Sequence, residues 1–202
     1  MFSEKMKKLI DIFSKFPTVG KRTAIRFVFY ILKLDQKEID EMINEILQLR
    51  KSIKQCKLCY NLFESKGEDI CPICSDLKRD KSLICIVEKE MDLLTIEKTG
   101  IYHGLYFIIG GTIGKLKDEK QKEQIEKRIN VLIKRIKENN EIKEVILALN
   151  PTLEGQRTED FLRKKLKDLN IKTTKLGRGI PFGGELEYAD EETLNAAFEG
   201  RK

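Results

Sequence analysis

The sequence lacks the features that mark membrane and secreted proteins. No apolar run approaches the roughly 20 residues that a membrane-spanning helix needs. The opening stretch, MFSEKMKKLIDIF, carries acidic side chains and an amphipathic period, which is not typical of a signal peptide. We therefore predict a cytoplasmic protein with no membrane partner, in which cysteines serve metal or thiol chemistry rather than disulfides.

Motifs of several enzyme classes are also missing. There is no Gly-x-Ser-x-Gly nucleophile motif. The single histidine, His103, has no evident nucleophile beside it and is interpreted as a surface residue. The stretch around Gly20 is not a P-loop, because Lys15 stands where that motif needs its first glycine and Arg22 where it needs Ser or Thr.

The charge is mixed along the chain and only mildly basic. Lys and Arg number 39 against 33 Asp and Glu, a net charge of +6. This balance is compatible with a polyanionic partner but does not demand one. The hydrophobic fraction of 41% is sufficient for a real core.

Apolar residues recur at helical spacing through the first fifty residues or so. They predict one amphipathic helix over residues 2–16 and a second over residues 24–32. Asp35 and Glu38 predict a capping box that opens a third helix. We expect residues 1–53 to form a small helical unit.

The glycine turn between the first two helices suggests a helix-hairpin-helix. The backbone N–H groups at such a helix start, together with the helix dipole, attract phosphate. Lys21, Arg22 and Arg26 would surround a backbone phosphate of DNA or RNA, in contacts that are independent of sequence. The alternative is an ordinary helical turn whose basic side chains are solvated.

Four of the five cysteines predict a metal centre. They follow the pattern C-x2-C-x11-C-x2-C and are Cys56, Cys59, Cys71 and Cys74. Two such pairs complete a tetrahedral Zn²⁺ shell with no open position, so the ion is predicted to be structural. Its binding energy would replace the core that this segment lacks. Cys85, inside an apolar run, is predicted to be a packing residue.

From residue 83 onward, apolar runs alternate with amphipathic stretches. LICIV, LYFII, EVILAL and IKTTKL predict strands, and the stretches between them predict helices, one of them over residues 118–138. This alternation predicts a mainly parallel sheet with helices on its faces. The tail is predicted to hold a short strand and a helix capped by Asp190. The fold class is therefore an α+β chain of several modules.

Acidic residues follow the first of these strands. Glu88 lies at its carboxyl end and Asp92 one helical turn later, where they would either hold Mg²⁺ or favour a helix N-terminus. A two-metal site would want Asp-x-Asp after EVILAL, but Asn150 and Thr152 stand there, with Glu154 further on. The segment has the outline of a metal site without its charge.

With these pieces in order, the sequence resembles the RecR family of bacterial recombination mediators over essentially its whole length. The matching stretches are FPTVGKRTAIRFVFYIL, CKLC…CPICSD, RDKSLICIVEKEMDLLTIEKTGIYHGLYFIIGG, ALNPTLEGQRTEDFL and GRGIPFGGELEYADEETLNAAFEGR. The resemblance implies a helix-hairpin-helix domain over residues 1–53, a four-cysteine zinc finger over 54–79, a Toprim domain over 80–175 and an assembly segment over 176–202.

The resemblance also implies a function. RecR-like proteins are understood to be non-enzymatic, to form ring-like tetramers, to join RecO or RecF, and to help load recombinase onto single-stranded DNA. It implies zinc at the four paired cysteines and DNA contacts at Arg22 and Arg26. Glu88 matches the Toprim glutamate, and the segment around Asn150 replaces the catalytic Asp-x-Asp.

Two hairpin residues depart from the family pattern. Thr18 stands where the family usually has glycine, and threonine tolerates a positive φ badly. Lys21 stands where the family usually has proline, and it adds a charge.

Three functions follow from these observations. One is a Toprim nuclease or topoisomerase-like enzyme that uses Mg²⁺ at Glu88 and Asp92, against which the neutral Asn150 and Thr152 speak. Another is a zinc-ribbon module that binds RNA. We predict the third, a DNA-binding mediator and scaffold of recombinational repair.

Overall fold

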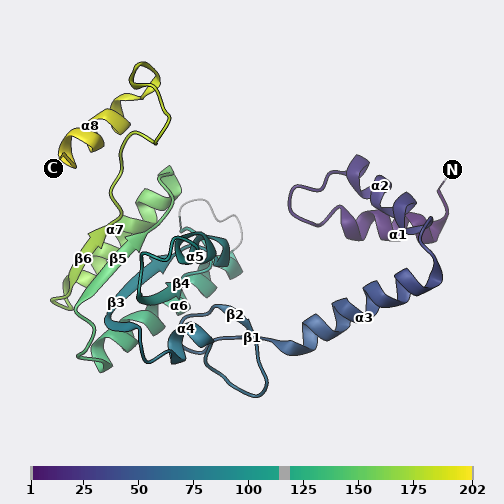
Figure 1. Ribbon diagram of the computed structural model, residues 1–202, viewed down its shortest axis with the longest axis horizontal. Coiled ribbons are helices and arrows are strands. Elements are labelled where there is room, and N and C mark those ends of the chain that lie inside the picture. The colour runs from purple at the N-terminus through teal and green to yellow at the C-terminus, as the bar shows by residue number, and fades with distance from the viewer. Residues whose placement is uncertain (1, 114–118, 202) are drawn as a thin grey trace. The chain divides into compact units, whose positions relative to one another are not determined.

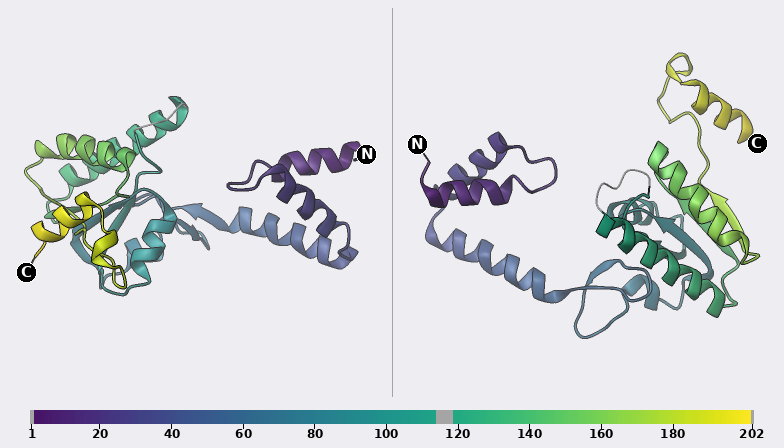
Figure 2. Two further views of the ribbon diagram at one scale, coloured as in Figure 1. Left: turned by 90° about the horizontal axis from the view of Figure 1, so that it is seen from above. Right: turned by 180° about the vertical axis from the view of Figure 1, so that it is seen from behind.

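The structure, a computed structural model, describes residues 2–113 and 119–201 of the chain. It contains two compact units, Met1–Ile53 and Lys54–Lys202. Figure 1 labels the helices and strands, and Figure 2 shows them from two further sides.

The first unit consists of helices α1, α2 and α3, as predicted. They span Glu4–Phe13, Lys21–Ile31 and Gln36–Ser52. The predicted capping box opens α3: Asp35 accepts a hydrogen bond from the Glu38 N–H at 2.8 Å, and Glu38 accepts one from the Asp35 N–H at 2.9 Å. Two backbone donors that the helix itself leaves unpaired are thereby satisfied.

The core of the first unit lies between α1 and α2. Ile10, Ala24 and Val28 are buried there. The ring of Phe13 packs edge-on against Phe16 and against Phe27, with centroids 5.7 and 5.8 Å apart. These contacts fix the two helices on either side of the glycine turn, so the turn is held by packing on both flanks.

The second unit begins with a short segment that has almost no hydrophobic core of its own. Strands β1 (Ile53–Gln55) and β2 (Leu62–Glu64) form a two-stranded sheet, and helix α4 covers Pro72–Ser75. Its buried side chains are Cys56, Cys59, Cys71 and Phe63. Three of these four are cysteines, as expected where a metal takes the place of a core.

The rest of the second unit is built on a parallel sheet, as predicted. Its strand order is β4-β3-β5-β6, with bounds Gly104–Ile108, Asp80–Val87, Glu144–Ala148 and Lys172–Lys175, and each neighbouring pair is parallel. Val87 at the end of β3 lies beside Ile108 and Ala148. The carboxyl ends of these strands therefore meet at one edge of the sheet.

Helices cover both faces of this sheet (Figure 2). On one face Leu93 of α5 (Glu90–Glu97) packs with Cys85 and Tyr106. The other face carries α6 (Glu119–Glu138) and α7 (Leu153–Lys167) over the larger core. Residue 118, where the sequence predicted the long helix to begin, lies outside the described residues.

The C-terminal segment corrects one prediction and confirms another. In place of the expected short strand lies a 3-10 helix, Leu186–Tyr188, because this segment does not pair with the sheet, which ends at β6. Helix α8 (Glu191–Glu199) follows with the predicted cap: Asp190 accepts a hydrogen bond from the Thr193 N–H at 2.8 Å. Among the described residues, no helix has both the length and the apolar character to cross a bilayer.

Candidate metal centre and nucleic-acid interface

The four predicted zinc ligands converge on one point of the second unit. The Sγ atoms of Cys56, Cys59, Cys71 and Cys74 all lie within 4.8 Å of one another. The Sγ atoms of Cys59 and Cys71 are 3.6 Å apart. Zn–S bonds of about 2.3 Å in a tetrahedron place sulfurs roughly 3.8 Å apart. The cluster therefore fits a tetrahedral zinc ion.

The hydrogen bonds around these sulfurs suit thiolates. The N–H of Cys71 donates to Cys56 Sγ at 3.3 Å, and the N–H of Asn61 donates to Cys59 Sγ at 3.5 Å. Hydrogen bonds from the thiols of Cys59 and then Cys74 lower the pKa of Cys71. The same contact with Cys71 raises the pKa of Cys59. Four crowded sulfurs cannot all ionise without a cation, which zinc would supply.

The predicted DNA-contacting residues lie near the start of α2. Lys21, Arg22 and Arg26 are exposed. The N-cap of α2, Gly20, gives no side-chain cap, whereas Ser3 caps α1 in this way. A Cβ at Gly20 would meet nothing within 4 Å, so the space before the helix is open. This helix start offers amide donors, a favourable dipole and cations to an anion.

The turn before α2 takes the glycine-like conformation although Thr18 is not glycine. Thr18 has φ of 64°, and its hydroxyl donates to the Pro17 carbonyl oxygen at 2.6 Å. The N–H of Val19 closes the turn on the Phe16 carbonyl at 3.1 Å. The hairpin therefore forms at some strain, because a β-branched residue is disfavoured in this region of φ.

The predicted acidic site does not gather into a three-ligand cluster among the described residues. Glu88, 5% exposed at the end of β3, accepts a hydrogen bond from the Asn150 N–H at 2.8 Å. Asp92 accepts one from the Lys89 N–H at 2.9 Å and so caps α5. Glu154 lies half-buried in the first turn of α7. A role of these acids toward Mg²⁺ or a partner stays a prediction.

Gly155 allows α7 to begin against this strand edge. A Cβ there would lie 2.0 Å from the Asn150 carbonyl oxygen and 3.4 Å from Glu88 Oε1. The helix starts at Leu153, earlier than the sequence predicted, because the Thr152 hydroxyl accepts a hydrogen bond from the Gly155 N–H at 3.1 Å. The segment that would replace a catalytic Asp-x-Asp is thus a helix cap that also holds Glu88.

Two other predicted residues lie as expected. His103 is exposed. Cys85 is 2% exposed in β3, and burial raises the pKa of its thiol to about 12. A thiol that stays protonated in a core is an unreactive packing residue.

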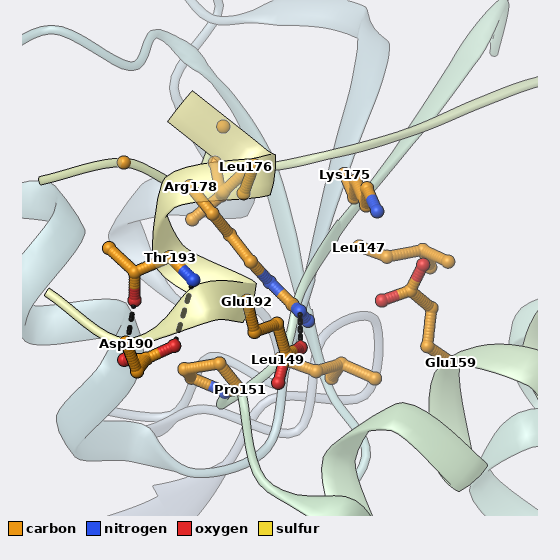
Figure 3. A pocket seen from close by; sticks show the side chains of 13 residues that line it. Leu147, Leu149, Pro151, Glu159, Lys175, Leu176, Arg178, Asp190, Glu192 and Thr193 are labelled. Atoms are coloured by element: carbon orange, nitrogen blue, oxygen red, sulfur yellow. Dashed lines mark hydrogen bonds and ion pairs between the residues drawn. The ribbon is translucent and has the colours of Figure 1, made fainter. Parts of the chain in front are cut away.

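A hollow of about 500 Å³ lies between the ends of β5 and β6 and the C-terminal segment (Figure 3). Its acidic groups have partners within the chain: Glu192 pairs with Arg178 at 3.1 Å, and Glu159 pairs with Arg163 at 2.9 Å. Asp190 serves as the cap of α8. The hollow therefore marks where the tail meets the sheet, and its acids are held in that contact.

Two arginines beside the cysteine cluster were not expected from the sequence. Arg128 and Arg135 of α6 belong to a helix whose many charges predict a solvated face, yet both are half-buried. Arg135 contacts Leu58, between Cys56 and Cys59, and Arg128 contacts Tyr60, directly after Cys59. The sequence did offer one indication of these contacts. Both positions hold arginine, not lysine, and guanidinium groups suit buried, planar contacts.

Comparisons with known proteins agree with this arrangement. Three family descriptions match: "RecR, helix-hairpin-helix" over residues 6–50, "Toprim domain" over 82–177 and "RecR, C-terminal" over 179–202. The chain is 41% identical to Recombination protein RecR of Clostridium perfringens, over 97% of this chain and 95% of that protein. It is 45% identical to the protein of that name from Cytophaga hutchinsonii, over 93% and 89%. It is 42% identical to the protein of that name from Chloroherpeton thalassium, over 98% of this chain and 97% of that protein.

These matches extend over both units and include the hairpin that carries Lys21 and Arg22, the parallel sheet and the tail. They agree with the resemblance that the sequence motifs indicated. The chain belongs to the RecR family.

Proposed function

We propose that this protein is a DNA-binding mediator and scaffold of recombinational DNA repair. It would act with RecO, RecF or both to load recombinase onto single-stranded DNA. The observation that carries the proposal is the start of α2. Its N-cap residue, Gly20, has no side chain to cap the helix, and the exposed Lys21 and Arg22 follow it. This start lies inside the segment that matches the RecR helix-hairpin-helix family. The names of the relatives support a role in recombination.

The hairpin would hold DNA by its backbone. Phosphate oxygens would accept hydrogen bonds from the free amides of the first turn of α2, with Lys21, Arg22 and Arg26 neutralising the charge. None of these contacts reads a base edge, so binding would be independent of sequence. A loading factor that must act anywhere on a chromosome needs this kind of contact.

The cysteine cluster would hold one structural Zn²⁺ per chain. Four sulfur ligands close a tetrahedral shell and leave no position for water or substrate. The metal would therefore contribute folding energy to residues 54–79 and no chemistry.

We further propose that the protein is not an enzyme. Asn150 and Thr152 are poor ligands for a hard cation, and Asp92 serves as a helix cap. Asp92 and Glu154 would instead mark a face for a protein partner, and the buried Glu88 would hold the backbone beside it. The proposal has two further parts. Four chains would assemble into a ring through the C-terminal tail, and the protein would lie in the cytoplasm beside the chromosome.

Reconstitution tests the mediator role. Single-stranded DNA covered with its binding protein is mixed with recombinase, RecO and RecF, and recombinase loading is followed with and without this protein. We expect loading to accelerate with wild type and not with the Lys21→Ala, Arg22→Ala, Arg26→Ala triple variant. Mg²⁺-dependent DNA cleavage that Glu88→Gln abolishes would instead support the enzyme.

A further inference from the structure

The chain around the second cysteine, Cys59, is held from outside the cysteine cluster. Leu58, Cys59 and Tyr60 are consecutive, and each contacts an element of the Toprim domain. The Leu58 carbonyl accepts a hydrogen bond from Arg135 Nη1 of α6 at 2.8 Å. The Cys59 carbonyl accepts one from the Ile108 N–H of β4 at 2.9 Å.

Tyr60 provides the third contact. Its ring packs edge-on against Phe107 of β4, with centroids 5.4 Å apart. The guanidinium carbon of Arg128 lies 4.6 Å from the centroid of the same ring, and Arg128 Nη1 donates to the Ile108 carbonyl at 3.3 Å. Tyr60 has φ of 65°, a conformation that a bulky residue keeps only where its surroundings enforce it.

Both arginines come from one face of α6. Their neighbours along the helix, Lys134 and Lys137, are exposed, and Lys134 pairs with Glu138 of the same helix at 3.8 Å. The helix therefore uses arginine where it meets the cysteine segment and lysine where it meets water. A planar guanidinium can stack on a ring and donate to a carbonyl at the same time, which an ammonium cannot.

We infer that Arg128 and Arg135 are positioning residues for the metal: α6 clamps the first Cys-x-x-Cys turn in the shape that binds zinc. Groups that orient metal ligands without touching the metal change metal affinity by about 10- to 100-fold when removed. Because coupling is reciprocal, zinc in turn holds the turn against β4. This inference rests on the proposed zinc occupancy.

The test is the zinc affinity of purified full-length protein, measured by competition with a chromogenic chelator. Arg135→Met and Arg128→Met keep the apolar stem of the side chain and remove the guanidinium. We expect each to weaken zinc binding about 10-fold or more, with an intermediate value for Arg135→Lys. Lys137→Ala, on the same helix, should bind zinc as wild type does.

A second control separates positioning from general loosening. Leu166→Ala removes a buried side chain of α7, 1% exposed, from the larger core. It should lower the unfolding temperature without changing zinc affinity. Equal weakening of zinc binding in Leu166→Ala and in the arginine variants would overturn the inference.

Hydrogen exchange on wild type does not depend on any variant folding. Because the Ile108 N–H bonds to the Cys59 carbonyl, its protection should fall when the chelator removes zinc. One combination of results would overturn this inference but leave the zinc proposal standing. In it, wild type contains zinc, both arginine variants bind zinc with wild-type affinity, and removing zinc leaves the protection of the Ile108 N–H unchanged. Wild type that contains no zinc would overturn the zinc proposal as well.

Discussion

Among the described residues of the first unit, Thr18 is the one non-glycine residue with a positive φ. Its φ of 64° lies in the left-handed region, where a branched side chain clashes with its own backbone. The packing of Phe13 against Phe16 and Phe27 holds both flanks of the turn and so over-determines the geometry. The lysine at position 21 does not take part in this strain, because it already lies in α2.

Replacing Thr18 by glycine should therefore stabilise the first unit. We expect Thr18→Gly to raise the free energy of opening of the first unit by about 1 kcal/mol. Glycine removes the cost of a left-handed non-glycine residue, and the greater freedom of glycine in the unfolded chain offsets part of that gain. Hydrogen exchange of the α1 and α2 amides in the full chain measures this. Thr23→Gly, within α2, is the control and should lower protection. Lower protection in Thr18→Gly would contradict the assignment of strain.

A second residue-scale feature is the ion pair between Arg79 and Glu97. Their side chains are only 14% and 30% exposed. Arg79 also donates to the Gly104 carbonyl at 3.2 Å, and Tyr106 donates to Glu97 at 2.8 Å. The hydrogen bond from Arg79 lowers the pKa of Glu97 below its usual 4.5. The pair joins the end of the cysteine segment to α5 and β4.

The lowered pKa of Glu97 makes stability depend on pH. Its contribution is complete above the unfolded value of 4.5 and is lost as pH falls through the lower folded value. Glu97→Gln should cost about 1–3 kcal/mol near neutral pH and flatten the loss of stability below pH 4.5. Urea unfolding at a series of pH values checks this, with Glu141→Gln as an exposed control. Identical pH profiles for wild type and Glu97→Gln would contradict it.

At the scale of elements, the start of α7 depends on the absence of a side chain at Gly155. A Cβ there would lie 2.0 Å from the Asn150 carbonyl oxygen, so backbone must move. Gly155→Ala should destabilise the second unit by about 1–3 kcal/mol through overpacking. Thermal unfolding measures it. Gly179→Ala, where a Cβ would meet nothing within 4 Å, should change little, and equal stabilities for the two variants would show that Gly155 is not needed.

The elements set by local chemistry were predictable from sequence. The capping box of Asp35 and Glu38 needs only residues three apart, and it forms as predicted. The two Cys-x-x-Cys pairs place their sulfurs together because each pair is a local turn. The run LICIV is buried on both faces of the sheet, which a β-branched apolar stretch already indicated.

The elements set by distant partners were not predictable. The tail was expected to hold a strand, but a strand forms only with a neighbour. In the part of the chain that the structure describes, β6 is the edge strand and pairs with β5 alone. Asn150 binds Glu88 across 62 positions of sequence. Arg135 reaches Leu58 across 77, so its charge indicated a solvated helix face. In each case both residues are visible in the sequence, but nothing in it indicates that the fold brings them together.

At the scale of the whole molecule, the cysteine segment and the Toprim domain share one compact unit, while the hairpin lies in the other. Removing zinc should therefore act on the second unit. We expect a chelator to lower the unfolding temperature of that unit, because metal binding is folding energy for residues 54–79. Hydrogen exchange of α1 and α2 should not change. Cys85→Ala should bind zinc as wild type does, because Cys85 is not one of the four proposed ligands. Cys59→Ser removes a proposed ligand and should behave as the chelated protein does.

DNA binding at the hairpin is decided by measuring DNA affinity as a function of salt. Labelled single- and double-stranded DNA are titrated with wild type and with the Lys21→Ala, Arg22→Ala, Arg26→Ala variant. A second variant, Lys5→Ala, Lys8→Ala, Lys37→Ala, removes the same charge from exposed positions on α1 and α3.

Removing one phosphate-binding side chain should flatten the slope of log affinity against log salt by about one unit or slightly less. We expect weaker binding and a flatter slope for the hairpin variant, with the second variant close to wild type. An unchanged slope in the hairpin variant would contradict the proposed DNA site, because DNA would then be bound elsewhere and the turn before α2 would be an ordinary one.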